Sequence, residues 1–339
     1  MPSAYAEHAA ALETIDSGAE EADALVRLGR WLHAQGYQFT TVTPATHGRV
    51  NARPGAELSR TLRDVFGWSR PFAGAPVPPD MLAVMRLGNL LADGPGGLVR
   101  SKVRFSSIGG VLFAHSAYPT ADADAVFFGP DTMRFAALIS NELKQLPVPH
   151  GARVLDMGCG AGPGGIVAAQ CAAPLQPQRV LADINSRALR FARANAELAG
   201  MADVLFAQGD LFSAVEGDFD FIVANPPYLN DSAQRTYRHG GGNRGGALSE
   251  RIVREGLTRL APGGGWCCTP VPPSCRAQTR CWTRCGCRWA RTAGRGVTTN
   301  SIRMCSARNW PSPLMPTPNA LPWWPLWCKG RIREIPGHR

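Results

Sequence analysis

The residues best suited to chemistry are Asn225-Pro226-Pro227-Tyr228, which directly follow the apolar run at residues 221–224. Two consecutive prolines remove two backbone N–H donors and fix φ, so the chain must leave a sheet at this point. What remains is a rigid rim that carries an Asn amide, free backbone carbonyl groups and one aromatic face. This combination suits the binding of a planar –NH2 group, and a plain proline-rich strand exit is the alternative interpretation.

Earlier in the chain, three glycines at alternate positions (Gly158, Gly160 and Gly162) follow an apolar strand that contains Asp156. Glycine allows a tight turn and a close approach of the backbone to a ligand. Such a loop could serve a nucleotide phosphate or be only a tight turn. No Lys-Ser or Lys-Thr pair follows, and the glycine spacing differs from the dinucleotide-binding motif, so neither of those phosphate sites is indicated. The acid before the glycines favours a cationic ligand.

Two further acids end the next two predicted strands. Asp183 is placed to accept from both ribose hydroxyl groups of an adenosine-type ligand, with a helix N-cap as its alternative role. Asp210 could accept from an adenine amino group while Leu211 supplies an apolar face, and a simple turn residue is the alternative. Acids at three consecutive strand ends are more specific than any one of them.

At these motifs the chain resembles the class I S-adenosylmethionine-dependent methyltransferases, over about residues 98–262. The Asn-Pro-Pro-Tyr segment narrows the resemblance to the amino-group branch, which includes the protein-(glutamine N5) and adenine-N6 methyltransferases. Phe128-Gly129-Pro130-Asp131-Thr132 resembles the segment that lies over the cofactor in that family. The resemblance implies S-adenosylmethionine as cofactor and no metal. The implied cofactor-binding residues are Phe128, Thr132, Asp156, Gly158, Gly160, Gly162, Asp183, Asp210, Leu211 and Asn225.

The implied reaction is direct transfer of the cofactor's sulfonium methyl group to a weakly nucleophilic amide or aromatic amine. The side-chain oxygen of Asn225 and the carbonyl group of Pro226 would accept its two N–H bonds and aim its lone pair. The same acceptors would stabilise the positive charge that develops on nitrogen, and Tyr228 would stack on the planar group. The implied catalytic residues are Asn225, Pro226, Pro227 and Tyr228.

The leading interpretation is an N-methyltransferase that acts on a protein glutamine or a similar amide. The alternatives are methylation of a nucleic-acid base, methylation of an amine on a small-molecule natural product, and a module that binds the cofactor without turnover. The formal net charge of +10 does not by itself indicate nucleic acid, because residues 266–339 hold 12 basic residues and one acid. Residues 1–265 are close to neutral, which favours a protein or small-molecule acceptor.

Strands and helices alternate from Gly151 to Leu260, which predicts an α/β fold with a doubly wound, mostly parallel sheet. We expect a helical substrate-recognition domain at residues 1–95, an S-adenosylmethionine-binding domain at residues 96–265, and an irregular tail at residues 266–339. Alternation over residues 98–118 predicts a β-hairpin. Asp131 or Thr132 is expected to cap a helix at residues 133–146, and the run Pro163-Gly164-Gly165 departs from the usual family pattern.

The tail combines Arg, Pro, Cys and Trp without periodicity, and it holds eight of the 10 Cys and seven of the 9 Trp. A disulfide or zinc module and a disordered basic arm are two interpretations. A third follows from the genetic code. Trp266-Cys267-Cys268-Thr269 must be encoded TGG-TGY-TGY-ACN, and the frame that starts at the third base gives Val-Leu followed by Tyr or His. We hypothesise a frameshift near residues 263–266, which would deprive the sheet of its last strands.

The N-terminal 21 residues have no basic n-region and no apolar h-region, and no run is long enough for a membrane helix. Cys159 and Cys171 are the only cysteines before the tail, as in proteins of reducing compartments. We therefore expect a cytoplasmic protein without a membrane partner.

Overall fold

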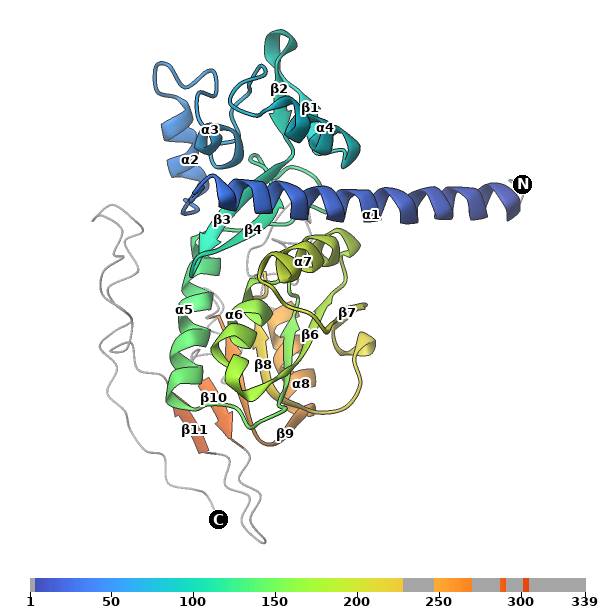
Figure 1. Ribbon diagram of the computed structural model, residues 1–339. Helices are drawn as coiled ribbons and strands as arrows, with labels where there is room; N and C mark the ends of the chain where they lie inside the picture. The colour runs from blue at the N-terminus through green and yellow to red at the C-terminus, as the bar shows by residue number, and fades with distance from the viewer. Residues whose placement is uncertain (1–3, 228–246, 270–286, 291–300, 305–339) are drawn as a thin grey trace, which may run out of the picture.

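The computed structural model describes residues 4–227, 247–269, 287–290 and 301–304. Figure 1 shows a small N-terminal part above the long first helix and a larger α/β part below it. The Tyr228 position and the glycine-rich run at residues 240–246 lie outside the described residues, as does most of the tail.

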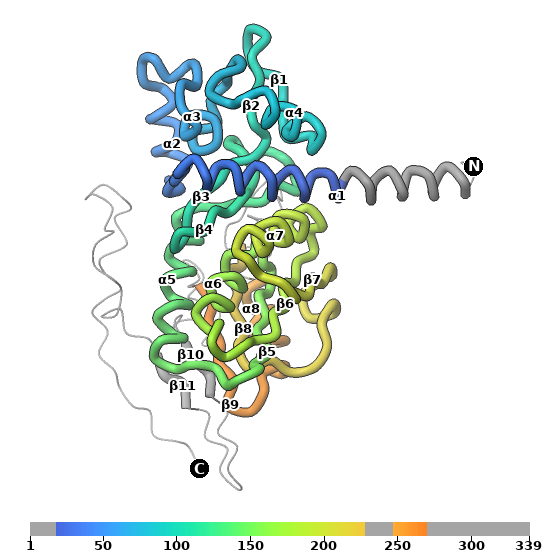
Figure 2. The backbone as a smooth tube through the Cα atoms, viewed as in Figure 1, coloured from blue at the N-terminus to red at the C-terminus, as the bar shows by residue number. Residues whose placement is uncertain are grey.

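The N-terminal part is mainly helical, as the sequence predicts, and it ends in a short antiparallel strand pair. Helix α1 runs between this part and the α/β part, and it packs against both α4 and α7 (Figure 2). Leu25, Leu28 and Leu32 form its buried stripe at helical spacing. The elements are α1 (Ala4–Ala34), α2 (Pro44–Asn51), α3 (Leu62–Phe66), α4 (Pro79–Leu87), β1 (Leu91–Asp93), the 3-10 turn η1 (Pro95–Gly97) and β2 (Val99–Ser101).

The predicted hairpin is confirmed. Strands β3 (Val103–Ile108) and β4 (Val111–Ser116) pair in antiparallel register, with Gly109 and Gly110 at positive φ in the turn. Phe105 of β3 and Phe113 of β4 are fully buried. The hairpin therefore carries its own apolar face into the core that it shares with α1 and α7.

The predicted parallel sheet is also confirmed. Its five strands have the order β7-β6-β5-β8-β9, and every neighbouring pair is parallel. The order reverses between β5 and β8, and ligands of such sheets bind beyond the strand ends at this kind of switch point. The strands are β5 (Arg153–Met157), β6 (Gln178–Asp183), β7 (Val204–Gln208), β8 (Phe219–Ala224) and β9 (Leu260–Cys268).

Both faces of the sheet are covered. Phe221 and Val223 of β8 pack with α5 and α6, whereas Ile222 and Ala224 pack with α8 on the other face. Because alternate residues of β8 are buried on opposite faces of the sheet, residues 221–224 are all apolar. The helices and 3-10 turns are α5 (Pro130–Gln145), α6 (Pro163–Cys171), η2 (Ala173–Leu175), α7 (Ser186–Leu198), η3 (Leu211–Ala214) and α8 (Ala247–Leu257).

Two boundaries differ from the expectation. Helix α5 begins at Pro130 rather than after Thr132, because Gly129 is its N-cap residue and Pro fits the first helical position. Strand β9 continues past residue 265 to Cys268, and Trp266, Cys267 and Cys268 are buried in it. A strand buried on both faces accepts any compact apolar run, so these three residues pack although they lie in the expected tail. Farther on, β10 (Cys287–Ala290) pairs antiparallel with β11 (Ser301–Met304).

Among the described residues, none of the helices combines the length and the apolar character that crossing a membrane requires.

Candidate functional site

The sheet register brings the predicted site residues to one edge. Met157 of β5 is paired with Ala182 of β6 and with Ala224 of β8, and Ala224 is paired with Cys268 of β9. The next residue of each strand therefore emerges at the same carboxyl edge, next to its neighbours. These residues are Gly158, Asp183, Asn225 and Thr269.

The glycine loop needs glycine for its conformation. Gly158, Gly160 and Gly162 have φ of 67°, 54° and 81°, a region that residues with a Cβ rarely adopt. The amides of Gly158 and Cys159 donate to the carbonyl group of Ala182, at 2.9 and 3.0 Å. A Cβ added at Gly158 or Gly160 would meet open space, so this backbone faces a volume that a ligand can enter.

Asp183 holds the loop from the neighbouring strand. One carboxylate oxygen accepts from the amide of Gly160 at 2.8 Å, and the other accepts from the amide of Asn185 at 2.9 Å. Burial raises the pKa of Asp183. The N-cap residue of α7 is Asn185, whose side chain accepts from the amide of Arg187. Asn185 rather than Asp183 is therefore the residue that caps α7.

Ile184 is a candidate that sequence reasoning missed. It directly follows Asp183, and its apolar side chain is 56% exposed. An exposed Ile beside a carboxylate at the ligand edge offers a surface for a planar ring. The sequence feature that could have identified Ile184 is a single apolar residue directly after an acid at a strand end.

Asp156 is the most buried acid of the site. Its side chain is 1% exposed, and one of its oxygens accepts from the amide of Gly165 at 2.7 Å. Burial raises the pKa of Asp156 to about 7, and the charge of Asp183 acts in the same direction. In the structure Asp156 fastens the start of α6 to the sheet, and its expected contact with a cationic ligand stays a prediction.

The unusual Pro163-Gly164-Gly165 run is explained by this close packing. A Cβ on Gly164 would lie 2.8 Å from the Asp156 carboxylate and 2.7 Å from the ring of Phe135. A Cβ on Gly165 would lie 2.6 Å from Leu181. Only glycine lets the first turn of α6 approach the sheet this closely.

Asp210 lies farther out along the same edge. It is exposed and forms a two-point ion pair with Arg251 of α8, at 2.8 Å and 3.0 Å. Leu211 is buried and has φ of 50°. The structure thus gives Asp210 a protein partner that the sequence did not indicate, and its role toward an adenine amino group stays a prediction.

Asn225 is fixed at both ends of its side-chain amide. Its Oδ1 accepts from the hydroxyl group of Thr269 at 2.8 Å, and its Nδ2 donates to the carboxylate of Asp131. A carboxylate only accepts, so this contact defines which end of the amide carries nitrogen. Pro226 is buried and Pro227 is half-buried, and Tyr228 lies outside the described residues.

The segment Phe128–Thr132, which leads into the first turn of α5, contributes less directly. The ring of Phe128 packs against His115 and Phe113, with centroid distances of 4.8 and 5.7 Å. Thr132 is buried, and its hydroxyl oxygen accepts from the amide of Gly129. Their expected contacts with the cofactor stay predictions, whereas Asp131 of the same segment reaches Asn225.

The residues at this edge fit S-adenosylmethionine. The carboxylate oxygens of Asp183 retain lone pairs for ribose hydroxyl groups, and the glycine backbone faces open space. This set of groups matches the ribose of an adenosine-containing ligand better than it matches a pyrophosphate, because a carboxylate accepts from hydroxyl groups and offers no donor to phosphate oxygens.

Comparison with known proteins gives a family match for the α/β part of the chain. Residues 136–269 match the family model described as the methyltransferase small domain. The match over this segment confirms the predicted resemblance to the S-adenosylmethionine-dependent methyltransferases.

Among curated relatives, the chain is 35% identical over 155 residues to a release factor glutamine methyltransferase of Deinococcus radiodurans, covering 43% of this chain and 54% of the relative. It is 34% identical over 116 residues to a ribosomal RNA small subunit methyltransferase C of Sodalis glossinidius, covering 34% of this chain and 29% of the relative. The matched segment thus spans about half of the first relative and less than a third of the second.

A solved structure of a ribosomal protein L11 methylase from Lactobacillus delbrueckii subsp. bulgaricus is similar with a TM-score of 0.33 and 22% identity. The similarity covers 43% of this chain and 62% of that one.

Proposed function

We propose that this protein transfers a methyl group from S-adenosylmethionine to an amide or amino nitrogen, with a protein glutamine side chain as the leading acceptor. The observation that carries the proposal is the pairing of Met157 with Ala224, which puts the glycine loop and Asn225 at adjacent strand ends. The relatives named as glutamine methyltransferases support the choice of acceptor.

The site residues have distinct tasks in this proposal. The bound cofactor supplies an electrophilic methyl group. The Oδ1 of Asn225 has two lone pairs, one of which accepts from Thr269, so the second is available to an acceptor N–H group. The Pro226 carbonyl group is the second acceptor, and prolines at 226 and 227 keep the rim rigid. A rim fixed in this way loses little entropy when the acceptor binds, which favours reaction geometry.

A nucleic-acid acceptor is the second candidate. It is favoured by the relatives named as ribosomal RNA methyltransferases. The near-neutral charge of residues 1–265 argues for the protein acceptor, because RNA binding draws most of its affinity from phosphate contacts.

The test uses the purified full chain, S-adenosylmethionine labelled in its methyl group, and an extract treated with nuclease or protease in separate arms. We expect label in protein that survives nuclease and is released as N5-methylglutamine after enzymatic digestion. Label that disappears with nuclease would favour RNA. Cofactor binding with no label in any fraction would overturn the proposed activity and leave a binding module.

A further inference from the structure

A loop between β4 and α5 joins the N-terminal part to the edge of the sheet that carries the glycine loop. It consists of residues 117–125 and is called the latch loop below. Ser116 and Val126 close its base, because the amide of Ser116 donates to the carbonyl group of Val126 at 3.0 Å and the amide of Val126 donates to the Oγ of Ser116 at 2.9 Å. A surface loop whose ends meet in this way is a compact unit, so its tip can move while its base stays in place.

The first part of the latch loop is fastened to the N-terminal part by Tyr118. The ring of Tyr118 packs on the ring of His47, with 4.1 Å between the centroids. The backbone amide of Tyr118 also donates to the Oγ of Ser69 at 3.1 Å. Tyr118 is thus an anchor for the loop on the N-terminal part.

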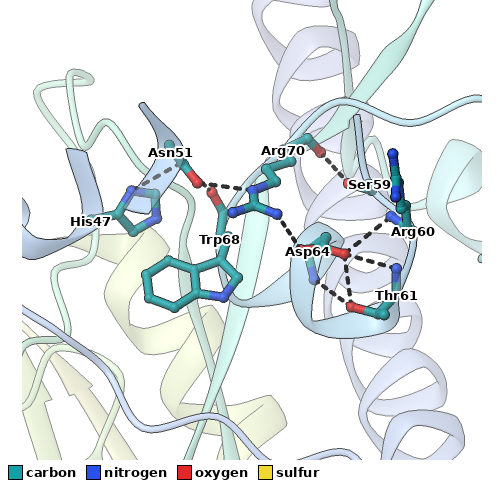
Figure 3. A network of polar contacts seen from close by, with 8 residues as sticks. All are labelled: His47, Asn51, Ser59, Arg60, Thr61, Asp64, Trp68 and Arg70. Carbon is teal, nitrogen blue, oxygen red and sulfur yellow. Dashed lines mark hydrogen bonds and ion pairs between the residues drawn. The ribbon is translucent and has the colours of Figure 1, made fainter. Parts of the chain in front are cut away.

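A network of polar contacts holds His47 in position for this anchor (Figure 3). The Nδ2 of Asn51 lies 3.3 Å from the Nδ1 of His47 and donates to the carbonyl group of Trp68 at 2.8 Å. The Oδ1 of Asn51 accepts from Arg70 at 3.0 Å, and Arg70 forms an ion pair with Asp64 at 2.6 Å. The side chains of Arg70 and Asp64 are only 14% and 13% exposed, so salt screens this pair little.

The tip of the latch loop is fastened to the start of α7. The carboxylates of Asp122 and Asp124 lie 3.4 and 3.1 Å from the Nη1 of Arg187. The side chain of Asn185 donates to the carbonyl group of Asp124 at 2.8 Å, while the backbone amide of Asn185 donates to Asp183 at 2.9 Å. The tip is therefore bonded to a residue that directly contacts the acid expected to bind the ribose.

The chain then crosses the site from one strand end to another. Asp124 is bonded to Asn185 after β6, and Asp131 is bonded to Asn225 after β8. Strand β5 lies between β6 and β8 in the sheet. Residues 124–131 therefore pass the carboxyl end of β5, where the glycine loop faces open space.

The position of Arg187 indicates that its charge serves the latch. Asn185 is the N-cap residue of α7, so Arg187 lies in the first turn of that helix. A cation at a helix N-terminus is disfavoured by the helix dipole, and the two carboxylates of the loop tip offset this cost. The Arg187 side chain is 14% exposed, whereas those of Asp122 and Asp124 are 71% and 55% exposed. The arginine is thus the packed partner, and the acids are the partners on the solvent side.

The contacts at the tip are of a kind that breaks easily. Residues 121–124 are all exposed, so burial of apolar side chains contributes little to holding them. Ion pairs with exposed partners contribute little stability and weaken as salt is added. A segment held in this way opens at a small cost in free energy, whereas the base and the Tyr118 anchor are expected to stay in place.

We propose that the latch loop is a gate for the cofactor, held closed by the ion pairs of Arg187 with Asp122 and Asp124. The proposal rests on the proposed function only for cofactor binding at this edge, and it holds for any methyl acceptor. Every latch contact joins two groups of the protein, so the gate can close equally well before and after the cofactor binds. Such a gate slows entry and release by the same factor and leaves the affinity unchanged.

The test measures binding and release of S-adenosylhomocysteine by surface plasmon resonance on the immobilised full chain. We expect Arg187→Gln to raise the association and dissociation rates together, by about 3- to 10-fold, with an unchanged Kd. Asp122→Asn combined with Asp124→Asn removes the same ion pairs from the loop side. It should accelerate both rates equally, and adding Arg187→Gln to it should have no further effect. The control Arg30→Gln removes the exposed ion pair of Arg30 with Glu197, near the other end of α7, and should keep the wild-type rates.

The salt dependence of the rates gives a second readout. Raising sodium chloride from about 0.05 to 0.5 M should accelerate both rates in the wild-type protein and have less effect in Arg187→Gln. Unchanged rates in the variants, acceleration in Arg187→Gln alone, or faster release with a weaker Kd would overturn the gate and leave the proposed function intact. A wild-type protein that does not bind S-adenosylhomocysteine would overturn both.

Discussion

The side-chain oxygen of Asn225 accepts a hydrogen bond from the hydroxyl group of Thr269, with 2.8 Å between the two oxygen atoms. The two residues follow paired positions on β8 and β9, since Ala224 is opposite Cys268. The strand that begins in the methyltransferase domain and continues past residue 265 thus supplies a contact to the proposed catalytic amide. Thr269, which lies in the segment of unusual composition, is therefore in direct contact with a residue of the proposed site.

Asn225→Ala should separate cofactor binding from transfer. The substitution removes the side-chain oxygen that would accept a hydrogen bond from the nitrogen to be methylated. The transfer rate should therefore fall about 100-fold or more. Affinity for S-adenosylhomocysteine, measured by calorimetry, should change little, because the glycine loop and Asp183 are untouched. Equal losses of affinity and rate would contradict the role assigned to Asn225.

Asp131→Asn should reduce transfer through the orientation of Asn225. The carboxylate only accepts, so it keeps the Nδ2 of Asn225 facing it, whereas an amide at position 131 also tolerates the flipped side chain. We expect a rate about 10- to 100-fold lower at saturating acceptor, with cofactor affinity retained. Lys144→Gln is the control, since Lys144 is an exposed residue in the last turn of the same helix. An unchanged rate in Asp131→Asn would show that Thr269 alone orients the amide.

Gly164→Ala should destabilise the fold through crowding alone. The added Cβ would fall within 2.8 Å of the Asp156 carboxylate and of Phe135, and Gly164 has no positive φ to complicate the result. We expect a loss of about 1–3 kcal/mol in the free energy of unfolding, measured with urea. Gly48→Ala in α2 is the control, because its Cβ meets nothing and should stabilise by about 1 kcal/mol or less. Similar effects of both substitutions would refute the packing argument.

Asp156→Asn should flatten the dependence of stability on pH. The pKa of Asp156 is about 7 in the folded protein and 3.8 for the free side chain. The native state holds this proton more tightly, so its contribution is fully present below about pH 4 and is lost as pH rises to 7. Wild type should therefore lose more stability than the variant between pH 5 and pH 8 in urea titrations.

The Asn side chain can still accept from Gly165, so that contact is preserved in the variant. Parallel pH profiles for the two proteins would contradict the raised pKa of Asp156.

Many elements followed from the sequence because their causes are local. The alternation around Ile108-Gly109-Gly110 predicted the hairpin, and the alternation of strands and helices predicted the parallel sheet. The start of α5 was displaced because Gly129 carries the cap, whereas Asp131 and Thr132 lie in the first turn. Polar residues such as Asp131 and Thr132 are common both at the N-cap and in the first turn, so local propensity did not identify Gly129 as the cap.

The sequence by itself indicated the class of protein and the strand end at which each group emerges, because an apolar run that stops at a proline pair, a glycine-rich turn or an acid marks the end of a strand within a few residues. The tertiary structure alone decided the partners, which are Asp131 and Thr269 for Asn225 and Arg251 for Asp210. Such contacts join residues far apart in the chain, and they depend on strand register and helix packing, which no local pattern encodes.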